Sequence, residues 1–493
     1  MTMNGQAPVD VDVVIIGAGF AGLGMGIRLL RERSESFVVL ERADDVGGTW
    51  RDNTYPGVAC DVPSHLYSLS FRPKPDWSRV FSPGREIWEY LRSAAEDEGL
   101  LPHIRFRTNM ERSTWDDSVS RWIVETSNGT YRGRFLVLAA GHLADEHLPD
   151  IEGLSEFEGA VFHSARWDHT ADLEGKRVGV VGSGASAIQI VPAIVDSVDE
   201  LVVFQRSAPW VMPRGDRAYS QAEKRMFERV PETRSALRDD LFWALEANYA
   251  TRRQTEPFLS NAKAMATAQL ENQVHDHELR ERLTPDYELG CKRVLLSNDY
   301  YPAVSRAHVT VEPSALVHIG STNAVSALGN SYEVDVLIFA TGFDATEPRY
   351  GPQVVGRNGL SLSQHWDQGM RALDSTAVSG FPNLFIINGP NTGLGHNSIV
   401  YVVEAQVDYI LGALQYAAEN DVASLEADAD AEQDYVDRLR HRSAGTVWLD
   451  GGCKSWYVDP RSGELTIIWP DFAHAFRDDN AEFAPGRYQA VRG

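Results

Sequence analysis

The sequence predicts an α/β fold with two lobes of the same design and a helical insertion in the second lobe. Two glycine-rich turns support this prediction: Gly17-Ala-Gly19-Phe-Ala-Gly22 and Gly182-Ser-Gly184-Ala-Ser-Ala187. Each follows a short β-branched run and precedes a helical pattern, the order that is typical of a Rossmann-like unit. After Ser220 the composition changes, and helical patterns with few β-branched residues continue to about Leu283.

The composition is that of an ordinary globular protein, and its charge excludes one class of partner. The chain has 493 residues, 43% hydrophobic and 24% charged, which predicts about two to four domains. The formal net charge of −24 argues against a nucleic-acid-binding surface, because phosphate contacts need clustered Lys and Arg. No run reaches the roughly 20 apolar residues of a membrane span, so we expect no membrane segment.

Cysteine usage predicts a reducing compartment. The three cysteines are Cys60, Cys291 and Cys453, and no two form a C-x-x-C pair. We therefore expect unpaired thiols rather than a disulfide framework, and a cytoplasmic location. The absence of a C-x-x-C pair also argues against a thiol–disulfide reductase, because that class shares the two-lobe layout but needs a pair of redox-active cysteines.

The first turn has the features of a dinucleotide site. It lies between an expected buried strand at 13–16 and an expected helix at 21–31. This order directs backbone N–H groups and the positive end of the helix toward a pyrophosphate. Glu41 ends the next expected strand, 37–40, and stands 41 − 17 = 24 residues after Gly17. An acid at this spacing accepts hydrogen bonds from ribose hydroxyls.

The second turn differs from the first at two positions. It follows an expected strand at 178–181, and Ala187 replaces the third glycine, a variant that the motif tolerates. Arg206 ends the next expected strand, 201–204, at the same spacing of 206 − 182 = 24 residues. A guanidinium at this place pairs with a 2′-phosphate, so the sequence predicts NADPH rather than NADH.

Between the two turns lies the stretch FEGAVFHSARWD. Its pattern is F-x-G-x-x-x-H-x-x-x-W-D, in which the specified positions are Phe157, Gly159, His163, Trp167 and Asp168. The pattern resembles the fingerprint of type I Baeyer–Villiger monooxygenases, flavoenzymes that insert one oxygen atom of O2 beside a ketone carbonyl. The resemblance implies that His163 and Trp167 hold the two lobes in relation, without a proton-transfer role for His163. Heteroatom-oxidising flavin monooxygenases typically lack the Trp-Asp end.

Further motifs of the same family follow in the expected order. The run from Gly47 to Asp61, with G-G-x-W, Y-P-G and C-D, resembles the segment beside the flavin ring, so the first site is assigned to FAD. The spacing argument and the resemblance together assign cofactor contacts to Gly17, Gly19, Phe20, Gly22, Glu41, Gly48, Thr49, Trp50, Asp61, Tyr67, Gly182, Gly184, Ser186, Ala187, Arg206, Ser207, Lys292, Asn397 and Trp456.

The family's active-site arginine falls on Arg293, in the stretch Gly290-Cys-Lys292-Arg293 before D-Y-Y. The resemblance implies a flavin C4a-peroxide that must stay deprotonated to attack a carbonyl. A guanidinium does not titrate near neutral pH, so it stabilises this species and the anionic adduct. Asp61 is the carboxylate expected to hold it in place. No side-chain nucleophile or metal is required.

The C-terminal part is expected to return to the FAD lobe. A regular helix is expected from 396–398 to about Glu419, with Asn397 and Ser398 as flavin contacts through their backbone or as simple N-caps. The segment 428–437 is acidic and expected to be exposed. Trp456, in S-W-Y, resembles a mobile segment that closes over the nicotinamide cofactor; a core tryptophan is the alternative.

The expected organisation therefore has five segments. They are an FAD-binding part (1–145), an NADP-binding part with the fingerprint as linker (146–213), the helical insertion (214–289), the second NADP-binding part (290–372) and the second FAD-binding part (373–493).

The predicted function is NADPH- and O2-dependent conversion of ketones to esters or lactones. The alternatives are oxidation of amine or sulfide heteroatoms, and a non-catalytic nucleotide-binding redox sensor. Partners are the ketone and O2, in a monomer or homodimer; the particular ketone is not readable.

Overall fold

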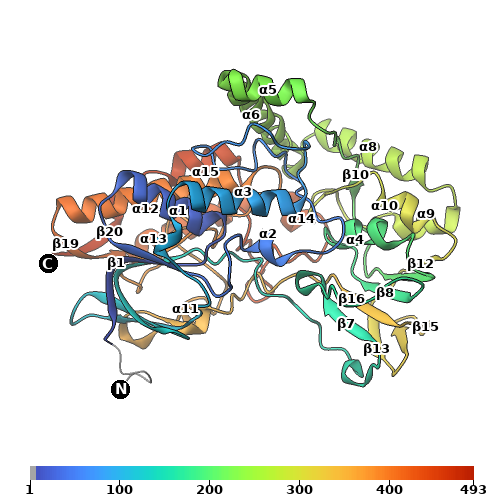
Figure 1. Ribbon diagram of the computed structural model, residues 1–493, viewed down its shortest axis with the longest axis horizontal. Helices are drawn as coiled ribbons and strands as arrows, with labels where there is room; N and C mark the ends of the chain where they lie inside the picture. The colour runs from blue at the N-terminus through green and yellow to red at the C-terminus, as the bar shows by residue number, and fades with distance from the viewer. Residues whose placement is uncertain (1–6, 493) are drawn as a thin grey trace.

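The computed structural model describes residues 7–492, which form two α/β lobes side by side. In Figure 1 the first lobe lies on the left and contains both chain ends, and the second lobe lies on the right. A group of helices from the middle of the chain runs along the top of both. The predicted α/β class with two lobes and a helical insertion is confirmed.

The sheet of the first lobe is parallel at its centre. Its strands are β1 (Val9–Ile16), β2 (Phe37–Leu40), β3 (Ile104–Arg105), β4 (Met110–Asp116), β5 (Arg121–Thr126), β6 (Gly129–Leu138), β17 (Val354–Val355) and β18 (Leu384–Ile386). Their order is β17-β4-β5-β6-β1-β2-β3, with β18 paired to β6. The strands predicted at 13–16 and 37–40 are thus β1 and β2, and β17 brings the chain back to this sheet.

Alternating side chains of β1 pack against two different layers. Val13 and Ile15 belong to the core under the helices α1 (Phe20–Glu32), α3 (Gly84–Asp97) and α12 (Ile399–Glu419). Val14 faces the opposite side, where the antiparallel strands β4 and β5 supply Trp115 and Trp122. A strand buried on both faces reads as a continuous apolar run, which is how the sequence revealed it.

The second lobe repeats this arrangement. Its parallel sheet has the order β12-β9-β8-β16-β7. The elements are β7 (Ala160–His163), β8 (Arg177–Val181), β9 (Glu200–Phe204), β12 (Val309–Glu312) and β16 (Val336–Phe339), with helices α4 (Ala187–Ile194) and α10 (Tyr300–Val304) and the meander β13 (Leu316–Ile319), β14 (Asn323–Ser326) and β15 (Ser331–Glu333). The helices pack on one face of the sheet and apolar residues of the meander on the other.

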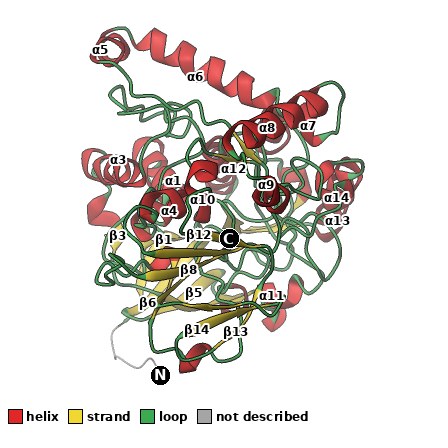
Figure 2. Cartoon of the chain, turned by 90° about the vertical axis from the view of Figure 1, so that its right-hand side faces the viewer, coloured by secondary structure: helices red, strands yellow, loops and turns green. Residues whose placement is uncertain are grey.

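The insertion is divided between the two lobes. It contains α5 (Gln221–Arg229), α6 (Pro231–Glu246), α7 (Tyr249–Arg252), α8 (Phe258–Gln273) and α9 (His277–Leu283). The capping box predicted at Ser220 and Glu223 is present at the start of α5. Phe227 and Phe242 join the core of the first lobe, whereas Leu270 and Leu283 join the core of the second. Figure 2 shows these helices above the sheets.

Helix α6 is fixed to the first lobe by two charged side chains eight residues apart, which places them on one helix face. Arg238 Nη1 donates to the carbonyl oxygens of His65 (2.7 Å) and Ser68 (3.0 Å). Glu246 accepts from Asn397 Nδ2 (2.7 Å) and from the Ala473 amide (3.1 Å). Burial opposes ionisation, but these bonds and those of two histidines lower the pKa of Glu246 to about 2.

The C-terminal region completes the first lobe. It contains α11 (Leu362–His365), α13 (Ala429–Ser443), α14 (Val447–Asp450), α15 (Ala473–Asn480), β19 (Val422–Ala427) and β20 (Tyr488–Arg492); the short elements α2 (Thr49–Asp52), β10 (Val211–Met212) and β11 (Leu295–Leu296) lie earlier in the chain. The expectation that 428–437 is exposed is wrong at Glu432, which is fully buried. Arg371 Nε lies 2.7 Å from its carboxylate and compensates its charge, and His365 Nε2 lies 2.9 Å from the same carboxylate.

The expectation of three unpaired thiols is also wrong. Cys291 and Cys453 form a disulfide across 162 residues of sequence, with their Cα atoms 6.1 Å apart. The fold brings together two loops that no short spacing connects, so the pairing left no mark in the sequence. Cys60 is free and buried. Within residues 7–492 no helix combines the length and apolar composition needed to cross a bilayer.

Candidate active site

The first glycine turn accepts only glycine at two of its positions. Gly17 has φ +102°, and a Cβ there would lie 2.8 Å from the Ala139 carbonyl oxygen. A Cβ on Gly22 would lie 1.9 Å from the carbonyl oxygen of Gly17. The backbone of Gly48 also approaches closely, since a Cβ there would lie 3.2 Å from Gly19 Cα. The turn before α1 is therefore a bare-backbone cradle, which fits a pyrophosphate.

Glu41 fixes this cradle to the end of β2. Its carboxylate is 4% exposed and accepts hydrogen bonds from the amides of Ala18 and Ala43, both at 2.9 Å. Arg51 lies 3.1 Å away. Each carboxylate oxygen has two lone pairs, so these bonds leave capacity for a ribose hydroxyl.

Aromatic side chains line the same region of the first lobe. Tyr67 makes edge-on contacts with Phe20 and Trp50, with ring centroids 5.1 and 5.6 Å apart. Trp50 Nε1 donates to the Tyr67 hydroxyl at 3.2 Å. Thr49 begins the short helix α2 and is exposed. Burial raises the pKa of Tyr67, so this hydroxyl is neutral at physiological pH.

The second glycine turn repeats the positive φ of the first glycine but accepts a side chain at its third position. Gly182 has φ +116°, and a Cβ there would lie 2.5 Å from the Ala340 carbonyl oxygen. At Gly184, by contrast, a Cβ would meet nothing within 4 Å. Helix α4 begins at Ala187, which is fully buried, with Ser186 at the N-cap.

Two cations and a hydroxyl gather beyond this turn. Lys292 Nζ donates to Ser207 Oγ at 2.6 Å and lies 4.5 Å from the centre of the Tyr287 ring. Arg206 is exposed and forms no ion pair within the described chain. Burial and the neighbouring charge of Arg206 lower the pKa of Lys292. Cations without a carboxylate partner at the end of a nucleotide-binding strand fit a phosphate monoester.

Arg293 and Asp61 form a two-point ion pair. Arg293 Nε and Nη2 each donate to a different oxygen of Asp61, both at 2.7 Å, although the residues are 232 positions apart. The negative charge of Asp61 raises the pKa of Arg293 further above its ordinary value. Burial opposes ionisation of Asp61, but the charge and hydrogen bonds of Arg293 outweigh it and lower the carboxyl pKa. The pair stays charged and carries a fixed guanidinium.

The fingerprint stretch is part of the second lobe rather than a free linker. Its residues 160–163 form the edge strand β7, in which His163 pairs with Phe339 of β16. A Cβ on Gly159 would lie 2.2 Å from the Asp335 carbonyl oxygen, so this strand can approach its neighbour only with glycine. Phe157 packs into the core beneath the meander.

Local contacts account for the other fingerprint side chains. His163 Nδ1 accepts from the Ala165 amide at 3.1 Å, and burial lowers the pKa of His163, which keeps the ring neutral. Trp167 packs edge-on against Phe162 at 5.0 Å. Asp168 accepts from the amide and hydroxyl of Thr170 and so fixes the turn that follows.

Similarity in sequence and in structure assigns the chain to a known family. The flavin-binding monooxygenase-like family model matches residues 10–359. The chain is 44% identical to a Baeyer–Villiger monooxygenase of Streptomyces coelicolor, over 100% of this chain and 95% of the relative. It is 42% identical to a Baeyer–Villiger monooxygenase of Pseudomonas aeruginosa, over 97% and 90% of the two chains.

The chain belongs to the Baeyer–Villiger monooxygenases of the flavin-binding monooxygenase-like family. The structure of cyclohexanone monooxygenase from Rhodococcus sp. Phi1 bound to NADP+ superposes with a TM-score of 0.86 at 26% identity, covering 99% of this chain and 100% of that one. An oxidised steroid monooxygenase bound to NADP gives 0.85 at 30% identity, covering 98% and 100%. FAD and NADPH as cofactors, and oxygenation of ketones as the reaction class, follow from this membership.

Two further predicted residues of this Baeyer–Villiger monooxygenase, Asn397 and Trp456, differ in exposure. The Asn397 side chain is buried against Glu246 of the insertion, so only its backbone is left for a flavin contact. Helix α12 begins at Ile399 and ends at Glu419, as expected. Trp456 is 44% exposed, with its ring 6.3 Å from that of His142, and this excludes the alternative of a core tryptophan.

The sequence missed three residues that connect segments far apart in the chain. Glu246 joins the insertion to the start of α12, and no spacing pointed to it. Gln189 of α4 joins the lobes, because it accepts from Tyr55 (3.0 Å) and donates to the Ala59 carbonyl oxygen (3.0 Å). Tyr457 is 2% exposed and lies beside Arg293, whose charge opposes the rise of the tyrosine pKa that burial causes. Of the three, only Tyr457 could have been found from the sequence, because it is the last residue of the S-W-Y motif.

Proposed function

We propose that Arg293, oriented by Asp61, is the catalytic cation of this monooxygenase. The overall reaction consumes ketone, O2, NADPH and a proton and yields ester or lactone, NADP+ and water. Bound FAD, reduced by NADPH, supplies the activated oxygen. Arg293 places a permanent positive charge where negative charge develops on the carbonyl oxygen, and Asp61 keeps the guanidinium in one orientation. The two-point ion pair between residues from different lobes is the observation that carries this proposal.

We assign the remaining predicted residues by their position. The glycine turn at 17–22, with Glu41 and the aromatic residues nearby, would hold FAD, in a lobe made of 1–145 and the chain from β17 onward. The turn at 182–187 would hold NADPH, in a lobe made of 146–213 and 290–339. The boundary predicted at 372 is therefore too late, because β17 at 354–355 already pairs with β4 of the first lobe. Arg206, Ser207 and Lys292 would bind the 2′-phosphate, because a phosphate monoester needs several charge-assisted donors.

We propose that the fingerprint stretch holds the two lobes at a fixed angle to each other. His163 closes the edge strand of the second lobe, and His169, directly after Asp168, lies 2.8 Å from the hydroxyl of Thr54 in the flavin segment of the first lobe. The insertion at 214–289 would set ketone selectivity. We further propose a cytoplasmic enzyme that acts as a monomer or homodimer.

The substitution Arg293→Ala tests the catalytic assignment. We expect ester formation from a panel of ketones to fall by at least about 100-fold, because one preorganised charge contributes on that scale. Reduction of bound flavin by NADPH under anaerobic conditions should stay within about twofold, since the hydride step does not use this cation. In air, NADPH oxidation should then release hydrogen peroxide in place of ester.

The matched control is Arg85→Ala, which removes an exposed arginine paired with Glu89 at 2.8 Å. This variant should form ester at the rate of the unmodified enzyme. Ester formation by Arg293→Ala at that same rate would contradict the assignment. Asp61→Asn should give an intermediate loss, because the guanidinium keeps its charge but loses one strong acceptor.

A further inference from the structure

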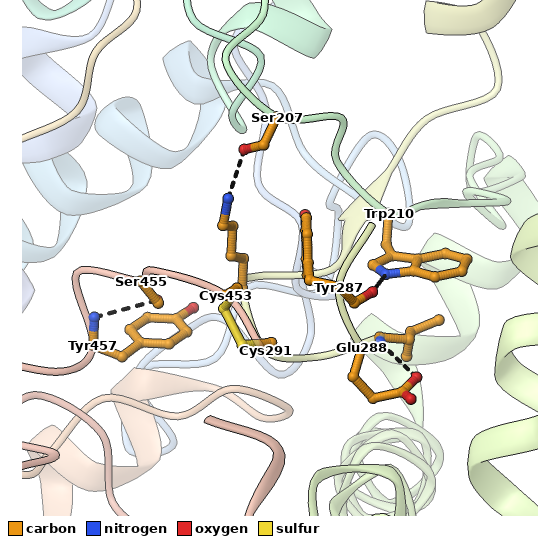
Figure 3. The surroundings of a disulfide bond; sticks show 10 residues. Ser207, Trp210, Tyr287, Glu288, Cys291, Cys453, Ser455 and Tyr457 are labelled. Atoms are coloured by element: carbon orange, nitrogen blue, oxygen red, sulfur yellow. Dashed lines mark hydrogen bonds between the residues drawn. A yellow bond between two sulfur atoms is a disulfide. The ribbon is translucent and has the colours of Figure 1, made fainter. Parts of the chain in front are cut away.

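The disulfide Cys291–Cys453 lies where the two segments around the proposed catalytic cation meet. Cys291 is two residues before Arg293, and Cys453 is three residues before Trp456. Figure 3 shows the sulfur–sulfur bond between them, with Ser455 and Tyr457 on one side and Tyr287 on the other. The bond therefore joins the arginine loop to the C-terminal loop.

The two loops are in close contact at this point. The Glu288 amide donates to the Gly451 carbonyl oxygen at 2.9 Å. A Cβ on Gly451 would lie 2.7 Å from the Cβ of Cys291. Tyr457 packs beside Arg293, and Trp456 contacts Tyr457 in a tilted arrangement with ring centroids 4.5 Å apart. Cys453 thus ties the arginine loop to the stretch that carries Trp456.

Residues 452–456 have few other anchors, whereas Tyr457 is buried in an apolar cluster with Tyr249 and Trp448. Within the described chain, the hydrogen bonds of residues 452–456 are local ones, which Ser455 accepts from the amides of Tyr457 and Val458. Residues 452–456 belong to no helix or strand. The disulfide is consequently the main anchor of the stretch that carries Trp456.

The two cysteines differ in exposure. Cys291 is completely buried, whereas Cys453 is half-buried. An external thiolate would therefore approach the bond from the side of Cys453. Accessible disulfides are the ones that exchange with thiols, and in reducing compartments such bonds are usually transient or redox-sensing.

We propose that Cys291–Cys453 is a redox modification site for thiol reagents, and that its opening releases residues 452–456 and weakens binding of NADP+. The proposal rests on the proposed NADPH site and on the role at the nicotinamide cofactor that the family resemblance implies for Trp456. An ordered loop binds with less loss of conformational entropy than a released one. The disulfide form is thus the tight-binding state.

The chemistry of opening is ordinary exchange with a dithiol. One thiolate of the dithiol attacks Sγ of Cys453, forms a mixed disulfide and releases Cys291 as a thiolate, which takes up a proton. The second thiolate of the reagent then displaces Cys453, which is protonated in turn. Two electrons pass to the cysteine pair and the dithiol becomes a cyclic disulfide. Hydrogen peroxide reverses the change, with two thiols giving one disulfide and two water molecules.

The experiment first counts thiols in the full-length holoenzyme. Oxidised and dithiothreitol-reduced samples are denatured and labelled with a maleimide that adds mass. The oxidised sample should show one label, on Cys60, and the reduced sample three, one for each cysteine of the chain. Three labels after peroxide treatment would overturn the proposal, because the pair would then not close.

Titration with NADP+, followed by tryptophan fluorescence, tests the consequence. Reduction should weaken binding by about 5- to 10-fold, reoxidation should restore it, and flavin content should not change. Cys453→Ser should bind like the reduced enzyme and ignore dithiothreitol. An effect of dithiothreitol that persists in Cys453→Ser would overturn the proposal, since another group would then be responsible.

Failure of this proposal can be told apart from failure of the proposed function. Equal and tight NADP+ binding in the one-label and three-label forms would overturn the redox site alone. If the label count changes but neither form binds NADP+, the NADPH site itself would be refuted, and the consequence proposed for the disulfide with it.

Discussion

The two glycine turns have a similar backbone conformation, but the strands that follow them end in residues of opposite charge. In the first lobe, Glu41 is buried and held by two backbone amides, so it is part of the turn's own architecture and keeps little remaining capacity for a ligand. In the second lobe, Arg206 is exposed and has no carboxylate partner within the described residues. Glu41 is held by the scaffold and has only its remaining lone pair for a ligand, whereas the guanidinium of Arg206 is fully available to one.

This difference explains how one fold can hold two nucleotides without exchanging them. The first turn requires glycine at its third position, and its acid suits hydroxyl groups. The second turn carries alanine at that position, and its cations suit a phosphate. We propose that selectivity comes from the residue at the end of one strand rather than from the fold, and substitutions on each side can test this.

The largest effect is expected from Gly22→Ala. The added methyl group would lie 1.9 Å from the Gly17 carbonyl oxygen, and neither backbone segment can move away without breaking the turn. We expect loss of bound FAD and destabilisation by about 3 kcal/mol, the upper range for overpacking. Visible absorbance of the purified protein and thermal unfolding measure both.

Gly24→Ala in the same helix is the control, because its Cβ would meet Leu69 and Val403 at the ordinary distances of 3.6 and 3.9 Å. It should keep FAD. The second turn already carries alanine at the equivalent position, 187, so a Gly22→Ala protein with full FAD content would show that the two turns do not differ in space.

The second-largest effect is expected from Arg206→Ala. Loss of a charge-assisted contact of about 1.5–3 kcal/mol should raise the KM for NADPH roughly 10- to 100-fold and leave the KM for NADH unchanged. Arg206→Glu, which gives the second site the charge of the first, should favour NADH further. Steady-state kinetics with both nucleotides provide the measurement.

Arg306→Ala is the control for this pair, since Arg306 lies on the surface of the same lobe and contacts Asp196 at 3.2 Å. It should leave both KM values unchanged. An unaltered ratio of NADPH to NADH efficiency in Arg206→Ala would contradict the assignment of the 2′-phosphate.

The smallest effect is a pH dependence from Lys292. Because its pKa is lowered, the amine loses its proton at a lower pH than an ordinary lysine. The cation is present below that pKa and absent above it, so the KM for NADPH should rise about fivefold as the pH increases through it. Lys292→Met should have the raised KM at every pH.

Arg206→Ala should move this transition to higher pH, because removal of a neighbouring positive charge favours the protonated amine. Lys263→Met, which removes a lysine paired with Glu288 at 2.9 Å, should leave the pH profile intact. A KM that does not depend on pH in the unmodified enzyme would exclude Lys292 from the phosphate site.

Local patterns predicted the framework of this fold well. The strand at 37–40 and the end of α12 at Glu419 fall on the expected residues, because apolar runs and helical spacing are properties of neighbouring residues. The contact between Asp61 and Arg293 was anticipated only through the family resemblance, since 232 residues separate them.

Long-range partnerships were not predictable in the same way. The disulfide, the burial of Glu432 and the hydrogen bonds of Glu246 each depend on loops that meet only in three dimensions. A charged residue in an acidic helix looks exposed until its partners, here Arg371 and His365, are known. Sequence spacing contains no information about such pairs.

The divided insertion has a practical consequence for protein engineers. Helix α6 fits the first lobe through Arg238 and Glu246, and α8 and α9 fit the second through their apolar side chains. A graft of this segment from another enzyme would have to match receiving surfaces on both lobes at once. Libraries that vary single positions within the segment, with these contacts kept, are therefore the safer route to new ketone preferences.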